Sequence, residues 1–513
     1  MIRAYEAEAV RAAEAPLLAA TAPDELMRQA AYAVATAVLD ELRRLGARRS
    51  GSTVLLLVGG GNNGGDALYA GGYLARRGLQ VAAALCTDQP HARALAAARA
   101  AGVRTHTVLD GTGRPRWDLL ARLADRGGVW VDGLTGIGAT GGLREPLAGV
   151  VAALEEQRAA MPDEPTVVAV DVPSGIGVDD GVVTGPVLRA DVTVTMGAVK
   201  PGLVVPPADA RAGRLVVVDL GLAAGLSAPA VRRLTAADVA DLLPAPRPSD
   251  HKYTRGVLGL AAGSTAYPGA AVLAAAGALR TGLGMVRYLG PEPVAGLLHH
   301  RFPEVVVGAG RVQAWAAGSG VDPADDARAD EVRDAVARAL ADGLPAVLDA
   351  GALSLAPDRL APNVVLTPHA GELARLLTDR GEAATRADVE AAPLPAARRA
   401  AALTGAVVLL KGATTVVAAP GGACLTQADG TPWLATAGTG DVLAGVLGAL
   451  LAVRGEDLAE GRDPGGSLTA ELAAAAALLH GRAGRLASAG GPVTALEVAD
   501  ALPEVVAELL SAA

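Results

Sequence analysis

The sequence has few aromatic residues and almost no cysteine. Phe, Trp and Tyr together make up 2% of the 513 residues, so alanine, valine and leucine must build the core. The two cysteines, Cys86 and Cys424, lie far apart in the chain. This spacing excludes a cysteine metal site and indicates thiols in a reducing compartment.

A long apolar segment and an excess of positive charge are also missing. The longest apolar run, Val442 to Val453, is too short to cross a bilayer. The segment from Met1 to Ala15 lacks the apolar core of a signal peptide. A net charge of -9 is unfavourable for a nucleic-acid surface. We therefore expect a cytoplasmic protein that binds neither membranes nor nucleic acid.

The length of the chain exceeds what one ordinary core can hold, so we expect more than one domain. An alternation of strands and helices runs through the chain twice. Between about residues 223 and 250 it breaks into alanine, proline and polar residues, including Pro244 to Pro248. We interpret this stretch as a linker or a domain boundary between two α/β patterns.

The first half opens with two expected helices within residues 1–50 and a buried strand at Thr53–Val58. A glycine turn and an alanine-rich helix follow. Gly59, Gly61 and Gly64 satisfy G-x-G-x-x-G, and Asp88 lies near the end of the next strand. Taken alone, this dinucleotide-binding pattern is weak.

Two aspartates follow expected strands at 129–131 and 167–170. Asp132 and Asp171 each precede a glycine loop, and ligands bind at the carboxyl ends of parallel strands. Together with the asparagine pair 62–63, they predict one shared pocket. The alternative is that both aspartates cap helices or turns. Further strands are expected at 192–194, 215–218, 256–260, 346–348, 364–366 and 407–410, and a further helix at 270–281.

A glycine-rich turn near the end of the second half leads into an apolar helix. Gly438 and Gly440 allow close approach of the backbone to a ligand, and the helix start favours negative charge. Asp441 is placed to accept a hydroxyl proton while the turn holds a phosphoryl group. It could instead be the helix N-cap.

These motifs together resemble the family of bifunctional NAD(P)H-hydrate repair enzymes, over nearly the whole chain. They stand in that family's order: Asn62–Asp66, Asp171–Gly175, Gly197–Gly202, His251–Tyr253, Tyr267–Ala271, Thr367–Glu372, Lys411–Thr415 and Gly438–Asp441.

The resemblance implies an α/β fold in two parts. Residues 1–228 would be a Rossmann-like three-layer domain that interconverts the R and S epimers of hydrated NADH or NADPH. Residues 229–513 would be a ribokinase-like α/β domain that uses ADP to dehydrate the S form, releasing AMP and phosphate. We also expect a homo-oligomer.

In the first domain the resemblance makes Asp171 the catalytic acid or base. It also implies a potassium ion bound by Asn63, Asp132 and Ser174. The hydrate would contact Asn62, Asn63, Gly64, Gly65, Asp66 and Asp171, together with Gly136, Ile137, Gly138, Ala139, Thr140, Gly141 and Gly142.

In the second domain it makes Asp441 the catalytic base. The hydrate would contact Ala270, Gly320, His369 and Asp441, although His369 could simply cap a turn. ADP, carried with magnesium, would contact Lys411, Gly412, Ala413, Thr414, Thr415 and Gly440.

Two positions depart from the family's pattern. Gly351 replaces an aspartate, and the 318–322 loop only approximates the family's glycine loop. The main alternative function is a ribokinase-type kinase of small molecules fused to a nucleotide-binding regulatory module. A binding module without catalysis, or a dehydrogenase, fits fewer of these residues.

Overall fold

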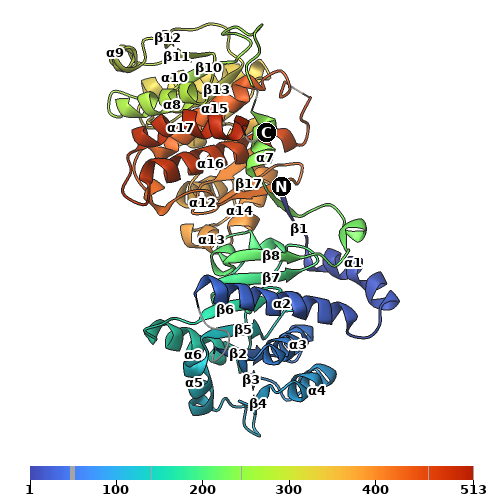
Figure 1. Ribbon diagram of the computed structural model, residues 1–513. Coiled ribbons are helices and arrows are strands. Elements are labelled where there is room, and N and C mark those ends of the chain that lie inside the picture. The colour runs from blue at the N-terminus through green and yellow to red at the C-terminus, as the bar shows by residue number, and fades with distance from the viewer. Residues whose placement is uncertain (47–51, 140, 244, 460, 512–513) are drawn as a thin grey trace. The chain divides into compact units, whose positions relative to one another are not determined.

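The chain divides into two compact units, each built around its own sheet (Figure 1). One unit is Arg3–Ala230, and the other is Val231–Ala513 together with Met1–Ile2. In this computed structural model the described residues are 1–46, 52–139, 141–243, 245–459 and 461–511. The α/β fold class that the sequence predicts is confirmed.

The first unit contains a 7-stranded parallel sheet in the order β4-β3-β2-β5-β6-β7-β8. Its strands are β2 (Thr53–Val58), β3 (Gln80–Leu85), β4 (Arg104–Thr107), β5 (Val129–Gly133), β6 (Thr166–Val170), β7 (Val192–Met196) and β8 (Arg214–Val218). Its helices are α1 (Ala7–Ala20), α2 (Glu25–Arg44), α3 (Asn62–Arg76), α4 (Ala92–Ala100), α5 (Trp117–Arg126) and α6 (Leu147–Ala160).

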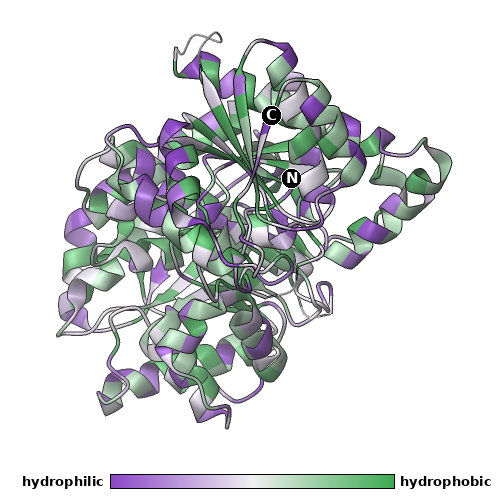
Figure 2. Ribbon diagram, turned by 90° about the horizontal axis from the view of Figure 1, so that it is seen from below, coloured by the Kyte–Doolittle hydropathy of each residue, from purple (hydrophilic) through white to green (hydrophobic). Residues whose placement is uncertain are grey.

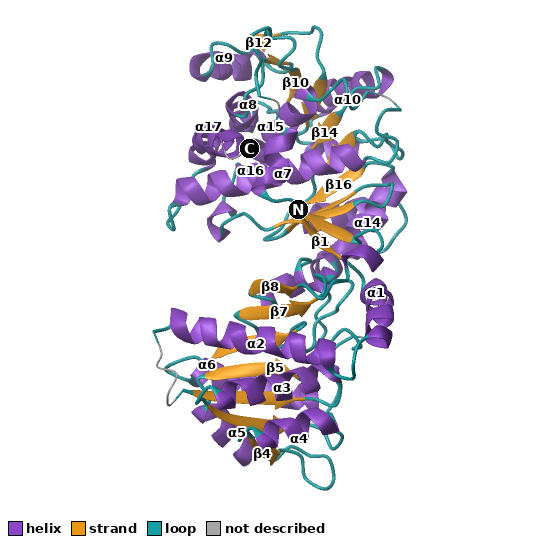
Figure 3. Cartoon of the chain, turned by 45° about the vertical axis from the view of Figure 1, so that its right-hand side comes forward, coloured by secondary structure: helices purple, strands orange, loops and turns teal. Residues whose placement is uncertain are grey.

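Alternate residues of the central strand β2 enter two separate cores. Val54 and Leu56 pack with α2, α3 and α4, whereas Leu55 and Leu57 pack with α5 and α6. This follows from the two-residue period of a strand. The helices therefore cover both faces of the sheet, as Figure 3 shows, and the unit has the expected three layers.

The second unit contains an 11-stranded sheet in the order β1-β9-β18-β17-β16-β15-β14-β13-β10-β11-β12. It is parallel from β12 to β16, and β17 and β18 add an antiparallel hairpin. The strands are β1 (Ile2–Ala4), β9 (Val231–Arg233), β10 (Val257–Ala261), β11 (Met285–Tyr288), β12 (Val306–Val307), β13 (Ala314–Ala317), β14 (Ala346–Leu348), β15 (Val364–Leu366), β16 (Val407–Leu410), β17 (Thr415–Ala418) and β18 (Cys424–Gln427).

The helices of this unit pack on the sheet and contribute to a large aliphatic core. Strand residues are mainly hydrophobic in Figure 2, while the helices carry both colours. The helices are α7 (Ala236–Leu242), α8 (Pro268–Arg280), α9 (Glu292–Arg301), α10 (Asp326–Ala341), α11 (Gly351–Leu355), α12 (Ala370–Asp379), α13 (Arg386–Ala391), α14 (Pro393–Thr404), α15 (Thr439–Val453), α16 (Ser467–Ser488) and α17 (Ala495–Ser511).

Helix α15 is apolar on every side, as expected of a helix enclosed by other elements. Glycines bring it very close to α8. A β-carbon added at Gly445 would lie 2.0 Å from the Ala274 carbonyl oxygen, and one at Gly277 would lie 2.3 Å from the Val442 carbonyl oxygen. This contact fixes α15 and therefore the glycine turn that precedes it.

Three expectations about local structure are wrong. The boundary between the two units falls within 223–250, after Ala230, as expected, but the stretch is not irregular, because β9 pairs with β18 and α7 follows; Pro244 itself lies outside the described residues. Asn62–Asp66 do not form a turn but the first residues of α3. Strand β1 precedes the two helices of residues 1–50, where we expected helices alone. β1 and β9 have three residues each, too few to show a hydrophobic period.

Among the helices of the described ranges, none has the length and apolar character that a membrane span requires.

We predict that Gly445→Ala destabilises the second unit by about 1–3 kcal/mol or more, because the added methyl group overlaps the α8 backbone. The measurement is thermal unfolding followed by circular dichroism. Gly296→Ala in α9 is the matched control, since no atom lies within 4 Å of the added β-carbon and alanine favours a helix. Equal melting temperatures for the two variants would contradict the close packing.

Candidate active sites

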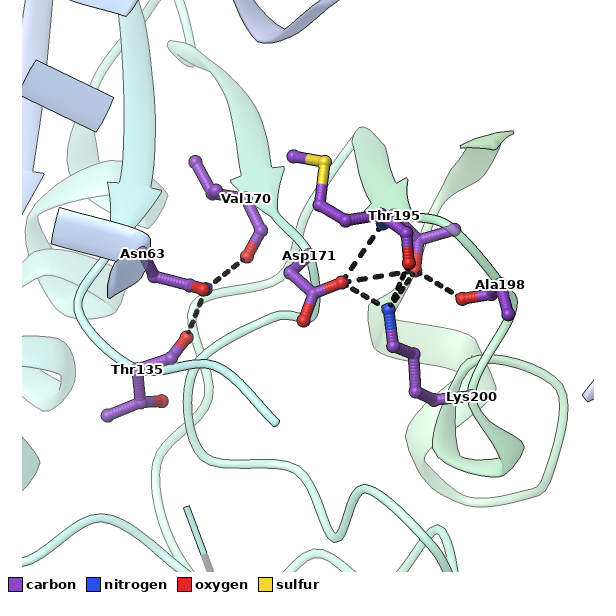
Figure 4. Close-up of polar contacts among 8 residues, drawn as sticks. Asn63, Thr135, Val170, Asp171, Thr195, Ala198 and Lys200 are labelled. Carbon is purple, nitrogen blue, oxygen red and sulfur yellow. Dashed lines mark hydrogen bonds and ion pairs between the residues drawn. The ribbon is translucent and has the colours of Figure 1, made fainter. Parts of the chain in front are cut away.

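A buried ion pair lies at the carboxyl end of β6 in the first unit. Asp171 follows β6, and its Oδ1 atom receives hydrogen bonds from the Lys200 ammonium group and from the Met196 backbone N–H at 3.0 Å (Figure 4). Lys200 has no solvent exposure, and Asp171 is 4% exposed. These hydrogen bonds are all made to Oδ1. They therefore orient the Asp171 carboxylate through one of its two oxygen atoms.

The backbone at Asp171 is in the left-handed region, with φ at 67°. Non-glycine residues seldom adopt this conformation, and it costs of order 1 kcal/mol or more. The hydrogen bonds to Oδ1 and the Asp171 N–H bond to the Val194 carbonyl at 2.7 Å hold it in place. Asp171 therefore does not cap a turn but is held rigidly at the sheet edge.

Asn63 joins the ends of two neighbouring strands. Its Nδ2 atom donates to the Thr135 carbonyl at 2.8 Å and to the Val170 carbonyl at 2.6 Å (Figure 4). Val170 directly precedes Asp171, so the asparagine and the aspartate belong to one site. The amide orientation is inferred from these hydrogen bonds.

Asp132, at the end of β5, is bonded to the loop that follows Asp171. Its Oδ2 accepts from the Ser174 N–H at 2.8 Å, and its Oδ1 accepts from the Ser174 hydroxyl at 2.7 Å and from the Leu134 N–H at 3.2 Å. Burial raises the pKa of Asp132, and the Ser174 and Leu134 bonds only partly oppose this. The structure thus brings Asp132 and Ser174 together as predicted.

The negative charge of Asp171 raises the pKa of two further carboxyl groups. Burial raises the pKa of Asp66 well above its usual range, and the charges of Asp171 and Glu14 raise it further. The pKa of Glu14, on α1, is raised by burial and by Asp171, while Lys200 lowers it. Sequence reasoning missed Glu14, which no motif marks, and Lys200, which stands in the quoted 197–202 motif without a role.

The remaining predicted residues of the first unit lie around this cluster. Asn62 is exposed at the start of α3, and Gly64 and Gly65 are buried in its first turns. A β-carbon at Gly136 would lie 2.3 Å from Asn63 Oδ1. Ile137 packs against the core. Thr140 lies outside the described residues, and an adjacent cavity is lined by Gly138, Ala139, Gly141 and Gly142.

In the second unit the predicted glycine turn precedes α15. Gly438 is the N-cap residue with φ at 90°, and no side chain caps this helix. Asp441 therefore lies within the first turn and is not the N-cap residue. Burial raises the pKa of Asp441 to about 6, and the charge of Asp349 adds to this, while Lys411 and a Ser319 hydrogen bond lower it.

Lys411 is the centre of a polar cluster beside this turn. Its ammonium group donates to Asp349 Oδ1 at 2.8 Å. The same carboxylate accepts from Thr367 at 2.8 Å and from Ser319 at 2.9 Å. Burial lowers the pKa of Lys411, but the charges of Asp349, Glu372 and Asp441 outweigh it and raise the pKa. Asp349 and Ser319 were not among the predicted site residues, although Asp349 directly follows the strand expected at 346–348.

The predicted nucleotide residues converge on the same place. A β-carbon at Gly440 would lie 3.5 Å from Lys411 Nζ, so the glycine turn and Lys411 face one another. Gly412, Ala413 and Thr414 form the bend after Lys411, and Thr415 begins β17. A site with a lysine ammonium group, a helix N-terminus that no side chain caps and a carboxyl group of raised pKa suits phosphoryl transfer.

His369 caps helix α12. Its Nδ1 atom accepts from the N–H groups of Gly371 at 3.0 Å and Glu372 at 3.2 Å. In this structure His369 therefore has the capping role that was the alternative to contact with the hydrate. The side chain is 54% exposed, and contact with a hydrate stays a prediction.

Ala270 and Gly320, both predicted hydrate contacts, touch one another, because a β-carbon at Gly320 would lie 2.4 Å from the Ala270 methyl group. Gly351 is tightly enclosed: a β-carbon there would lie 2.2 Å from the Val321 carbonyl oxygen. The family's aspartate therefore has no room at this position, given this conformation of the 318–322 loop.

Family models match both halves of the chain. Residues 23–202 match the YjeF-related protein N-terminus, and residues 258–504 match NAD(P)H-hydrate dehydratase. The bifunctional NAD(P)H-hydrate repair enzyme Nnr of Mycobacterium tuberculosis is 42% identical over 87% of this chain and 89% of its own. The enzyme of the same name from Mycobacterium leprae is 40% identical over 94% of both chains.

A solved structure of an ADP/ATP-dependent NAD(P)H-hydrate dehydratase from Bacillus subtilis, co-crystallised with ATP and Mg²⁺, is 31% identical. It covers 54% of this chain and 99% of its own, with a TM-score of 0.47. The predicted α/β fold in two parts is confirmed by the two sheets, one in each unit. Both family models match in order, and two bifunctional relatives are 42% and 40% identical over most of the chain. The chain therefore belongs to the family of bifunctional NAD(P)H-hydrate repair enzymes.

Proposed function

We propose that this chain repairs hydrated NADH and NADPH in two steps. Residues 1–228 interconvert the R and S epimers at C6 of the nicotinamide ring, and residues 229–513 dehydrate the S form with ADP. The observation that carries the proposal is Asp441, a carboxyl group with a pKa of about 6 in the first turn of α15, beside Gly440, which faces Lys411. Such a group can accept a hydroxyl proton near neutral pH.

In the dehydration step, Asp441 takes the proton from the C6 hydroxyl group as that oxygen attacks the terminal phosphorus of ADP. The bond between this phosphorus and the bridging oxygen breaks, and AMP leaves. The N–H groups after Gly438 and the Lys411 ammonium group stabilise charge on the moving phosphoryl group. The ring nitrogen then expels phosphate from C6, and loss of a proton from C5 restores NADH or NADPH.

Magnesium bound with ADP would neutralise phosphate charge in this step. The dehydratase from Bacillus subtilis crystallised with ATP and Mg²⁺ supports this. Lys411, Gly412, Ala413, Thr414, Thr415 and Gly440 would contact the nucleotide, and Ala270, Gly320 and His369 the hydrate.

In the epimerisation step, Asp171 takes the proton from the C6 hydroxyl group as the C6–N1 bond breaks, and the proton passes to N1, which leaves an open-chain aldehyde at C6. N1 then closes on the other face of the aldehyde, and the proton returns through Asp171 to the C6 oxygen of the other epimer. Lys200 orients Asp171 through Oδ1, and burial of the pair excludes water. The residues around α3 and the 136–142 loop would enclose the hydrated ring. Asp66, whose pKa is raised by burial, is available as a protonated partner for Asp171.

A potassium ion in the first unit is part of the proposal, held by Asn63, Asp132 and Ser174. All three offer oxygen atoms, which a hard cation requires, and two carbonyl oxygens already meet at the Asn63 amide. The ion would supply fixed positive charge near the reacting oxygen.

We further propose a cytoplasmic homo-oligomer. Both cysteines are free and buried, as is usual in a reducing compartment. At the sheet edge, Val306 and Val307 of β12 are 37% and 43% exposed, and a second copy could cover them.

Asp441→Asn is predicted to lower the dehydration rate by about 10²- to 10⁴-fold, the usual loss when a general base is removed. Epimerisation should be unchanged. The assay follows recovery of reduced-nicotinamide absorbance from S-hydrate and ADP, and chromatography follows the epimers. A variant that keeps more than about a tenth of the rate would exclude Asp441 as the base. Phosphorylation of unrelated alcohols by ATP would instead favour the kinase alternative.

The rate of dehydration is predicted to rise with pH, with a midpoint near pH 6, because protonated Asp441 cannot accept a proton. Asp349→Asn should move this midpoint downward, since the negative charge of Asp349 raises the pKa of Asp441. The measurement is kcat/KM for S-hydrate from pH 5 to 8. The epimerisation profile of the same variant serves as the control, and a midpoint that does not move would contradict this assignment.

Asp171→Ala is predicted to consume the S form with ADP and then stall, leaving the R form to react only as fast as it epimerises spontaneously. Adding the Asp441→Asn protein, which keeps the first site, should release the stall. Complete conversion of mixed epimers by Asp171→Ala alone, faster than spontaneous epimerisation, would overturn the division of labour.

A further inference from the structure

A cavity of about 470 Å³ lies beside the Asp171 site in the first unit. This volume is within the range of small-ligand pockets, about 300–1,000 Å³. It extends past the glycines of the 136–142 loop to residues that have no role in the proposed epimerisation: Thr87, Asp88, Leu109, Arg144 and Glu145.

The position of this cavity follows from the strand order. β4-β3-β2-β5-β6-β7 is the order of dinucleotide-binding folds, in which the ligand crosses the carboxyl ends of the strands where the order reverses. Here that point lies between β2 and β5. Asp171 follows β6, on one side of it, and Asp88 follows β3, on the other. A dinucleotide with its hydrated ring at Asp171 would therefore extend its adenosine toward β3.

The glycine turn between these two ends has the spacing that a diphosphate requires. A β-carbon at Gly59 would lie 1.9 Å from the Leu134 carbonyl oxygen, and one at Gly64 would lie 2.2 Å from the Gly59 carbonyl oxygen. At Gly61, by contrast, no atom lies within 4 Å. The first and third glycines thus permit a tight turn and close helix packing, and the second faces open space at the start of α3.

Asp88 is exposed at the end of the cavity, and no hydrogen bond or ion pair to it is found among the described residues. Thr87, next to it, approaches the turn: its hydroxyl oxygen lies 3.1 Å from where a Gly60 β-carbon would be. An acidic residue at this strand end accepts hydrogen bonds from a ribose 2′-hydroxyl and repels a 2′-phosphate. Two carboxylates, Asp88 and Glu145, line the cavity against one guanidinium group, Arg144.

We propose that this cavity is the adenosine-ribose subsite of the epimerase and that Asp88 makes it prefer NADH-hydrate to NADPH-hydrate. The inference rests on the proposed epimerisation for its biological meaning, but the binding preference can be measured without any reaction.

The first measurement is direct binding by titration calorimetry of ADP-ribose and of its 2′-phosphorylated form, neither of which carries nicotinamide. The full chain is used as wild type, Asp88→Ala and Asp125→Ala. Asp125 is an exposed aspartate on α5 that does not line the cavity. We expect the wild type and Asp125→Ala to favour ADP-ribose by at least about tenfold, and Asp88→Ala to lose most of this preference. Equal preferences in all three proteins would overturn the subsite.

The second measurement is kcat/KM for epimerisation of each hydrate without ADP, so that the dehydratase is silent. The preference for NADH-hydrate should fall about tenfold or more in Asp88→Ala, through KM for NADPH-hydrate rather than through kcat. A preference that is unchanged in Asp88→Ala would contradict the inference. Absence of epimerisation of both hydrates would contradict the proposed function, while the calorimetric result would still decide the subsite.

Discussion

A lysine without solvent exposure organises the first active site. The Lys200 ammonium group donates to Asp171, to the Thr195 hydroxyl at 3.1 Å and to the Met196 carbonyl at 2.9 Å, so its three N–H groups are all used. A buried charge that loses a partner costs several kcal/mol. The ends of β6 and β7 and the segment that carries Lys200 must therefore fold as one piece, and the strained backbone of Asp171 depends on them.

The second site also contains a lysine–aspartate ion pair, but the role of its aspartate is different. Lys411 is bonded to Asp349, another aspartate at a strand end, and Asp349 also accepts hydrogen bonds from Ser319 and Thr367. The proposed base is instead Asp441, on α15. The fixed negative charge of Asp349 adds to burial in raising the pKa of Asp441. In the first site the paired aspartate is the proposed reacting group, and in the second it tunes one.

The sequence alone predicted what short segments determine. Nine of the strands were located by continuous apolar runs, whereas short strands such as β4, β11 and β13 were not. Asp132 and Asp171 were found because each stands directly after an expected strand. The ion pairs were not predictable in this way, because Lys200 and Lys411 lie 29 and 62 residues from their partners. The roles of His369 and Asp441 depended on where a helix begins. α12 begins so that His369 caps it, and α15 begins two residues before Asp441, a distinction finer than sequence patterns resolve.

The enclosure of Gly351 links the two places where this chain departs from its family. Gly351 lies against the Val321 carbonyl, and a β-carbon at Gly318 would lie 2.1 Å from the Asp349 carbonyl oxygen. The altered 318–322 loop thus packs directly against the segment in which Gly351 replaces the family's aspartate. Their effects on stability are then coupled rather than additive. A change at either position would therefore alter which residues the other could accept.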